Sequence, residues 1–219
     1  MLPQNRNEKN ESSVKEFYEK PVFEEALRTK PEKIARYLTN EEEFLLGRVK
    51  NGAAIAELGC GDGRIVSLLG KYSDKIIGLD FSHYYVSKAK EKAPCSGIVR
   101  GDATNTPLKD ESFDYALFMF NTLGNLNREI QALNEAKRII KPEGSILFSV
   151  YSKKALPEQL GMYAALGLNV REVTADTVYT EEGLQSKALF DAGAEITGKS
   201  RWAFRRNKTA HANLIYRGA

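Results

Sequence analysis

The sequence predicts an α/β fold, in which a mostly parallel sheet carries helices on both of its faces. Two observations predict it. Short apolar runs of strand length alternate with helical segments between residues 53 and 151. A glycine-rich turn, Glu57-Leu58-Gly59-Cys60-Gly61-Asp62-Gly63, joins the first of these runs to the first helix. Apolar runs without alternation are typical of strands that are buried on both faces, as parallel strands are.

The composition is that of a globular protein. The 219 residues suit one large domain, and 42% of them are hydrophobic. The longest apolar run, Tyr115 to Phe120, is far shorter than the roughly 20 residues of a membrane helix. The first residues lack the apolar core of a signal peptide. Cys60 and Cys95 are too few for a disulfide framework or a zinc cluster. We therefore expect a cytoplasmic protein with no metal site and no membrane contact.

The N-terminal quarter is expected to lie outside the main domain. Residues 1–13 are polar and have no periodicity, which predicts a flexible tail. Residues 14–50 have helical apolar spacing. Pro31 suits the first turn of one helix, and Thr39, which precedes Asn40 and three glutamates, predicts the N-cap of another. Residues 51–219 are then left to form the main domain.

Five strands and three helices are predicted in the first part of the main domain. The strands are Ala53–Leu58, Lys75–Asp80, Gly97–Arg100, Phe113–Phe120 and Ser145–Tyr151. The helices between them are Arg64–Lys71, Ser82–Ala93 and Leu126–Ile140. Because strands that alternate with helices pair in parallel, their carboxyl ends are expected to meet at one edge of the sheet.

The last third departs from this alternation. A helix is predicted over Pro157–Leu168, a strand or extended loop over Val170–Tyr179, and a capped helix from Thr180 to Ala192. Ala194–Phe204 and Ala210–Tyr216 are strand-like and are separated by a short polar loop. The pair predicts an antiparallel hairpin at the C-terminal end.

The glycine-rich turn predicts a ligand site. Its glycines let the backbone turn tightly and let a ligand approach the main chain. A dinucleotide site carries Gly-x-Gly-x-x-Gly, whereas the spacing here is Gly-x-Gly-x-Gly. The carboxylates of Glu57 and Asp62 would repel a pyrophosphate and attract an ammonium or sulfonium group. The turn therefore favours a cationic ligand, with a plain tight turn as the alternative.

Two more carboxylates follow the next two strands. Asp80 lies about 20 residues after the turn, where nucleotide-binding α/β units place a carboxylate that accepts from ribose hydroxyls. Asp102 follows the third strand, where it could accept a hydrogen bond from an adenine amino group. A helix N-cap is the alternative for Asp80, and a turn residue is the alternative for Asp102. Three such features at successive strand ends predict one nucleoside site.

These motifs resemble those of the class I S-adenosylmethionine-dependent methyltransferases. The turn at residues 57–63 looks like the first motif of that family, and Asp80 matches its acidic second strand end. Further similar segments are Gly101-Asp102-Ala103, Phe113-Asp114-Tyr115 and Asn134–Gly144. The resemblance implies a Rossmann-like sheet of seven strands, the C-terminal hairpin supplying the last two. It also implies that residues 14–50 form a helical lid.

The resemblance further implies S-adenosylmethionine as the cofactor and a role for individual residues. The implied cofactor contacts are Glu57, Gly59 and Gly61 at the methionine part, Asp80 at the ribose, Phe81, Asp102 and Ala103 at the adenine, and Phe120 near the methyl group. Asn121, beside Phe120, is the candidate catalytic residue. The implied substrate contacts are Asn121 and, from the lid, Tyr18 and Tyr37.

The implied reaction is an in-line displacement that transfers a methyl group to an acceptor. A small-molecule acceptor is expected because no large substrate domain is inserted. The alternatives are a methyltransferase for RNA or protein, a cofactor-binding protein without transferase activity, and an NAD-dependent oxidoreductase, against which the glycine spacing argues. The oligomeric state stays open.

The C-terminal end bears on the nucleic-acid alternative. Lys199–Ala219 holds six basic residues and no acidic one, although the whole chain carries 32 basic and 29 acidic residues. Basic residues mixed with aromatic ones are found on nucleic-acid surfaces. On a hairpin, however, alternation separates Arg201 from Trp202 and Phe204. The pattern therefore favours a solvated sheet edge over a nucleic-acid surface.

Overall fold

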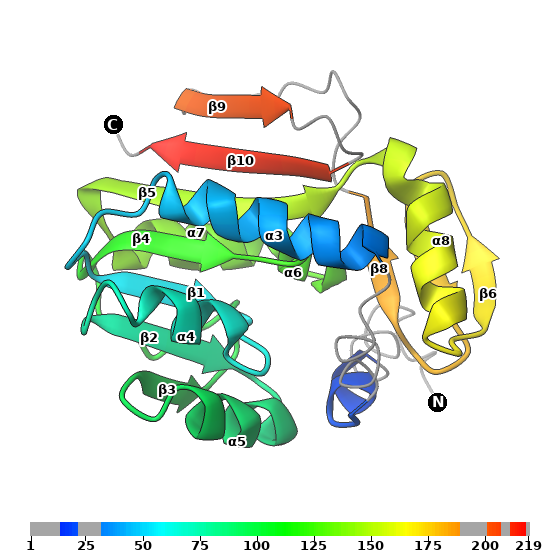
Figure 1. The fold of residues 1–219 in the computed structure, drawn as a ribbon, viewed down its shortest axis with the longest axis horizontal. Coiled ribbons are helices and arrows are strands. Elements are labelled where there is room, and N and C mark those ends of the chain that lie inside the picture. Colours follow the sequence, from blue (N-terminus) through cyan, green and yellow to red (C-terminus); the bar gives the residue numbers. More distant parts are fainter. Residues whose placement is uncertain (1–13, 22–31, 189–200, 207–210, 218–219) are drawn as a thin grey trace, which may run out of the picture.

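In a computed structural model of the chain, residues 14–21, 32–188, 201–206 and 211–217 are described. The expected tail, residues 1–13, lies outside them. The main sheet has the strand order β3-β2-β1-β4-β5-β10-β9 (Figure 1). Its strands are β1 (Ile55–Leu58), β2 (Ile76–Asp80), β3 (Gly97–Arg100), β4 (Phe113–Phe118), β5 (Ile140–Tyr151), β9 (Arg201–Arg206) and β10 (His211–Arg217).

The first five strands pair in parallel, and β10 and β9 are added antiparallel beyond β5. All four residues of β1 are buried, since the strand lies near the middle of the sheet and is covered on both faces. The Rossmann-like α/β class with a parallel sheet is thus confirmed. Within the described residues, no helix has the length and apolar character needed to cross a membrane.

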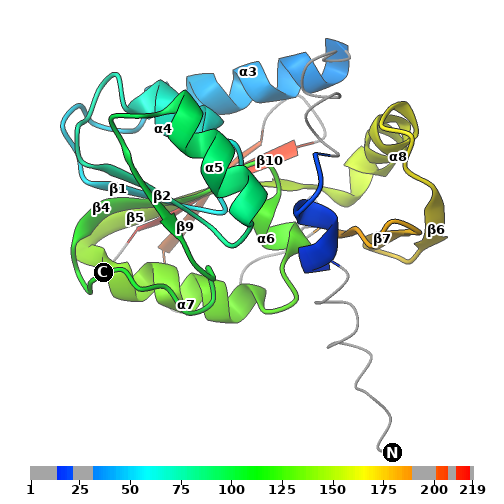
Figure 2. The same ribbon diagram turned by 90° about the horizontal axis from the view of Figure 1, so that it is seen from below.

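Helices cover both faces of the parallel strands (Figure 2). One face carries α3 (Glu32–Leu46), α4 (Arg64–Leu69) and α5 (His83–Lys92), and the other carries α7 (Glu129–Ile139), which follows the short α6 (Thr122–Asn125). Side chains of β1 alternate between two buried clusters. Ile55 packs with Leu45 and Ile65 on the first face, and Ala56 packs with Ile139 on the second.

A smaller antiparallel sheet follows the fifth strand. After a short turn of 3-10 helix, η1 (Lys153–Ala155), the chain forms α8 (Leu156–Ala165), β6 (Val170–Val173), β7 (Thr177–Thr180) and β8 (Gln185–Lys187). The order of the small sheet is β6-β7-β8. It lies with α8 beyond the carboxyl ends of β4 and β5 (Figure 1).

Two predicted helix starts are wrong. No helix begins at Thr180, because the turn at Gly183, with φ of 99°, returns the chain into β8. Leu184, just after that turn, is 2% exposed and packs with Tyr163 and Val178, so its burial outweighs the local capping pattern. No helix begins at Thr39 either, since α3 runs through it without a break. Continuing the helix through Thr39 is favoured by the helix propensity of the residues on both sides, which together stabilise it more than one N-cap hydrogen bond would.

Other predicted boundaries differ less. The stretch predicted as one strand, Val170–Tyr179, contains two antiparallel strands, β6 and β7. The helix predicted over Leu126–Ile140 begins later, at Glu129. Of the predicted strand Ala194–Phe204, only residues from 201 onward lie within the described part of the chain.

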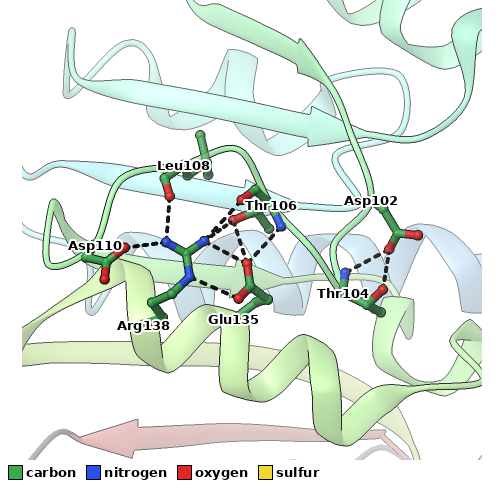
Figure 3. Close-up of polar contacts among 7 residues, drawn as sticks. All are labelled: Asp102, Thr104, Thr106, Leu108, Asp110, Glu135 and Arg138. Carbon is green, nitrogen blue, oxygen red and sulfur yellow. Dashed lines mark hydrogen bonds and ion pairs between the residues drawn. The ribbon is translucent and has the colours of Figure 1, made fainter.

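The connection between β3 and β4 is held to α7 by one arginine (Figure 3). Arg138 donates to both carboxylate oxygens of Glu135, at 2.9 and 2.7 Å. It also donates to the Leu108 carbonyl at 2.8 Å, and Glu135 accepts from the Thr106 backbone N–H at 2.8 Å. The bidentate Arg138 fork is the main reason why the pKa of Glu135 is lowered to about 2.

We expect Glu135→Gln to lower the free energy of unfolding by about 1–2 kcal/mol near neutral pH, because the fork loses its charged acceptor. The folded-state pKa of Glu135 lies below its ordinary value of 4.5. Its contribution is therefore complete above that value and is lost as the pH falls toward about 2. Urea unfolding of both proteins along an acid series measures this, with the exposed Glu143→Gln as control. An equal difference at every pH would contradict the assignment.

Candidate functional site

A cavity opens at the carboxyl ends of the parallel strands. It encloses about 1480 Å³ of space between atoms, including open solvent at its mouth. The predicted site residues that line it are Tyr18, Glu57, Gly59, Gly61, Asp80, Phe81, Asp102, Ala103 and Phe120. Tyr37 and Asn121 are not among the lining residues. Parallel pairing of β1, β2 and β3 brings these separate motifs to one edge.

The glycine-rich turn bends as tightly as its sequence predicts. Gly59 and Gly61 have φ of 79° and 52°, in the left-handed region. A Cβ on Gly59 would stand 2.5 Å from the Thr122 methyl group, so a side chain is excluded there. A Cβ on Gly61 would meet no atom within 4 Å, which leaves the backbone of Gly61 open to the cavity.

Glu57 is a buried carboxylate beside this turn. Its side chain is 3% exposed, and its Oε2 atom has no hydrogen-bond partner among the described residues. Burial raises the pKa of Glu57 well above its ordinary value, and the nearby Arg64 opposes the shift. A buried carboxylate oxygen without a partner is costly. The cavity therefore presents an unsatisfied acceptor to any ligand that brings a donor or a cation.

Asp80 joins the glycine-rich turn to the start of α5. One carboxylate oxygen accepts from the Gly61 backbone N–H at 2.8 Å, and the other accepts from the Ser82 N–H at 2.9 Å. Burial raises the pKa of Asp80, although these two hydrogen bonds oppose the shift. Asp80 is not the N-cap that was its alternative, since the N-cap of α5 is Ser82, which accepts from the Tyr85 backbone N–H.

Asp102 is oriented by its own turn (Figure 3). Its Oδ1 atom accepts from the backbone N–H and the hydroxyl of Thr104, at 2.8 and 2.7 Å. Its Oδ2 atom lies 3.7 Å from Lys15 Nζ and 3.6 Å from an Arg128 nitrogen. Burial acts to raise the pKa of Asp102, but these hydrogen bonds and cations outweigh it and lower the pKa. Asp102 is therefore ionised and held in place at the cavity wall.

The end of β4 carries an unusual backbone. Phe120 and Asn121 have φ of 52° and 61°, which is a strained region for residues other than glycine. Asn121 is 0% exposed. Its amide nitrogen donates to Ser186 Oγ at 2.9 Å, and its amide oxygen accepts from the Tyr151 N–H at 3.0 Å. The side chain of Asn121 thus fixes the turn from behind, and Phe120 faces the cavity.

A carboxylate that the sequence pattern indicates only as a first-turn helix residue lies behind the same turn. Glu41, from α3, is 0% exposed and accepts from the Phe120 backbone N–H at 2.7 Å. It also pairs with Arg64 and accepts from the Ser149 hydroxyl. Tyr37 donates to that same hydroxyl at 3.0 Å, and its ring packs against Phe120 without lining the cavity itself. Only a tertiary contact reveals this role, since three adjacent glutamates look alike in the sequence.

The N-terminal segment lies across the cavity. Residues 14–18 are helical, and Tyr18, at their end, accepts from the Asn125 side chain at 2.8 Å. The Tyr18 carbonyl accepts from the Ser82 hydroxyl at 2.9 Å. Glu19 accepts from the backbone N–H groups of His83 and Tyr84 at the start of α5. These hydrogen bonds join the segment to the edge that carries Asp80.

Comparison with known proteins agrees with this geometry. Residues 56–148 match the family model described as a methyltransferase domain. An uncharacterized protein of Methanocaldococcus jannaschii is 30% identical over 139 residues, which are 63% of this chain and 51% of that protein. A demethylmenaquinone methyltransferase of Staphylococcus aureus is 33% identical over 122 residues, which are 53% of this chain and 50% of the enzyme. The chain therefore spans about half the length of the curated relatives it matches.

Solved structures share the fold over most of the chain. The PH0226 protein of Pyrococcus horikoshii has a TM-score of 0.67 at 20% identity, and the match covers 93% of this chain and 98% of that one. A DhpI-SAM-HEP complex has a TM-score of 0.66 at 17% identity, with coverage of 98% and 99%. At this identity the likeness concerns the fold alone. Residues 56–148, which carry the glycine-rich turn, Asp80 and Asp102, are therefore similar to a methyltransferase domain.

Proposed function

We propose that this chain transfers the methyl group of S-adenosylmethionine to a small-molecule acceptor. The observation that carries the proposal is the buried Glu57 carboxylate, whose Oε2 atom lacks a partner among the described residues. A cationic group bound in the cavity would supply the missing partner. A pyrophosphate would bring negative charge against Glu57, Asp62 and Asp80, which argues against a dinucleotide.

The residues present fit the proposed cofactor. Glu57 and the open backbone at Gly61 would hold its amino-acid part, where the carboxylate faces an ammonium group. Asp80 keeps acceptor capacity beside its two backbone partners, as a ribose site needs. Asp102 and Ala103 would border the adenine. These residues come from the ends of three adjacent strands, which supports one continuous binding site.

The methyl group would lie near the turn at Phe120. When bound, S-adenosylmethionine supplies an electrophilic methyl group, and its sulfur keeps the electron pair of the broken bond. The protein positions the acceptor and excludes water, and it needs no nucleophile of its own. We propose Asn121 as a positioning residue instead of a catalytic one, because it binds Tyr151 and Ser186 behind the turn.

The N-terminal segment would act as the lid expected from residues 14–50. Its helical part at residues 14–18 brings Lys15 to Asp102 and Tyr18 to the cavity wall. Glu19 fastens the segment to α5 through the backbone of His83 and Tyr84. Closure of this kind would exclude water from the reaction.

A small acceptor is supported by what surrounds the cavity. The N-terminal segment, α8 and the turn before β8 each contribute lining residues beyond the end of β4. A macromolecular substrate would have to displace these contacts before reaching the methyl group. The Staphylococcus aureus relative is named for a small-molecule acceptor, demethylmenaquinone. RNA and protein substrates remain as outcomes of the test below.

We expect calorimetry to detect binding of S-adenosylmethionine and S-adenosylhomocysteine, and no comparable binding of NAD. Transfer of a labelled methyl group should reach a pool of small metabolites and not pools of RNA or protein. Asp80→Ala should weaken cofactor binding by about 1–3 kcal/mol, because the buried acceptor is lost. The exposed Asp74→Ala is the matched control. Tight NAD binding without binding of either adenosyl compound would refute the proposal.

We expect proton release when S-adenosylmethionine binds. Burial raises the pKa of Glu57 in the free protein, which favours its protonated form. The cationic cofactor favours the ionised form, so its binding should release that proton. Affinity should therefore rise with pH until the free carboxyl is ionised. Calorimetry in two buffers of different ionisation enthalpy measures the release. The release should vanish in Glu57→Gln, and its persistence there would assign the proton to another group.

We expect Glu41→Gln to lower the free energy of unfolding by about 2–4 kcal/mol, because Arg64 loses its buried counter-charge. The hydrogen bond to the Phe120 N–H should weaken as well. Urea unfolding and amide hydrogen exchange at Phe120 measure the two effects. Glu43→Gln, at an exposed position of the same helix, should change neither. Unchanged exchange at Phe120 would show that Glu41 does not hold the turn.

A further inference from the structure

The cavity has two ends of different chemistry. One end lies at β1, β2 and β3, where the glycine-rich turn, Asp80 and Asp102 are found. The other end lies beyond β4 and β5, where α3, α8 and the small sheet supply the wall. Tyr151 at the end of β5 and Leu184 before β8 add to this wall. Its lining residues are Leu38, Tyr151, Met162, Tyr163, Leu184 and Ser186. The second end, defined by these six residues, is called the distal end below.

Among the described lining residues, all charged side chains lie outside the distal end. Lys15 and Arg128 lie against Asp102, within 3.7 and 3.6 Å. Arg64 is paired with Glu41 and Glu42. The other charged lining residues are the carboxylates Glu57, Asp62, Asp80 and Asp102. The six residues of the distal end are all uncharged.

The polar groups of the distal end are engaged with protein atoms. Ser186 Oγ accepts from Asn121, and the Tyr163 hydroxyl accepts from Gln159 at 3.0 Å. The Tyr151 hydroxyl lies 3.9 Å from the Met162 sulfur. Burial raises the pKa of both Tyr151 and Tyr163, so these phenols stay neutral and act as donors and not as bases. A charged group placed among them would lose its hydration without gaining a counter-charge.

We propose that the distal end binds an uncharged, apolar acceptor. This inference rests on the proposed methyl transfer and names the acceptor class for that same site. The lone pair of the attacking atom forms the new bond to the methyl carbon, and the sulfur keeps the electrons of the C–S bond. Any proton on the attacking atom leaves to water, because the described residues of the distal end include no carboxylate or imidazole.

A neutral fluorescent probe tests the proposal and does not require the acceptor to be identified. N-phenyl-1-naphthylamine is titrated into the full-length protein saturated with S-adenosylhomocysteine, and its fluorescence is expected to rise on binding. Displacement is then compared for two molecules of nearly equal shape, neutral tert-butylbenzene and cationic phenyltrimethylammonium. The concentration of tert-butylbenzene that displaces the probe should be at least about tenfold lower than that of phenyltrimethylammonium. Nitrobenzene and benzoate give the corresponding comparison for an anion.

Variants locate the probe at the distal end. Leu184→Glu should weaken probe binding about tenfold or more, because the new carboxylate is buried with the probe. Val173→Glu is the matched control, since Val173 is 42% exposed in the same small sheet. Met162 is only partly buried, so Met162→Glu repeats the test if Leu184→Glu does not fold. Retained binding of S-adenosylhomocysteine shows that each variant is intact.

The outcomes separate this inference from the proposed function. If the wild-type chain binds no S-adenosylhomocysteine, the proposed function itself fails. If it binds S-adenosylhomocysteine but the cation or the anion displaces the probe as well as its neutral counterpart, the acceptor class is wrong. An intact Leu184→Glu or Met162→Glu protein that binds the probe with wild-type affinity would overturn the assignment to the distal end. Failure of the probe to bind the saturated wild-type protein would do the same.

Discussion

A buried carboxylate with three kinds of partner is the interaction on which the site depends. Glu41 pairs with Arg64 at the start of α4, accepts from Ser149 on β5, and accepts from the Phe120 N–H after β4. Removal of any partner would leave charge or a polar group without compensation in a water-poor region. The elements that these residues belong to are therefore kept in one relative position. The turn at Phe120, which faces the cavity, is thus held by Glu41, a residue 79 positions earlier in the chain.

The strained turn shows what this constraint accomplishes. The left-handed backbone at Phe120 and Asn121 costs free energy. Contacts with residues outside the turn must offset that cost. Glu41 of α3 accepts from the Phe120 N–H. The Asn121 side chain binds Tyr151 of β5 and Ser186 of β8. Phe120 is thereby presented to the cavity, between the carboxylate-rich end at β1–β3 and the uncharged distal end. The division of the cavity into these two environments follows from the order of strands in the sheet.

Local patterns predicted much of the sheet and the residues along its edge. Glu57, Asp80 and Asp102 each follow a short apolar run, and parallel pairing brought all three to one cavity. Their roles toward a cofactor stay predictions. The helix predicted at Thr180 was wrong, because the burial of Leu184 against Phe17 and Tyr163 is a long-range effect. Tyr37 and Asn121 were expected at the substrate, yet neither lines the cavity, and their side chains are hydrogen-bonded to Ser149 and Tyr151.

The sequence by itself determined the α/β class, the parallel strands and the acidic character of the cavity end at β1–β3. Hydrophobic periodicity and glycine spacing are local properties, and they suffice for these features. Only the tertiary structure decided which of the adjacent glutamates on α3 is buried, which way Asn121 points, and that the distal end is uncharged. Each of these depends on contacts between residues far apart in the chain. Burial and pairing there are set by how the helices and the small sheet pack, and no window of sequence carries that information.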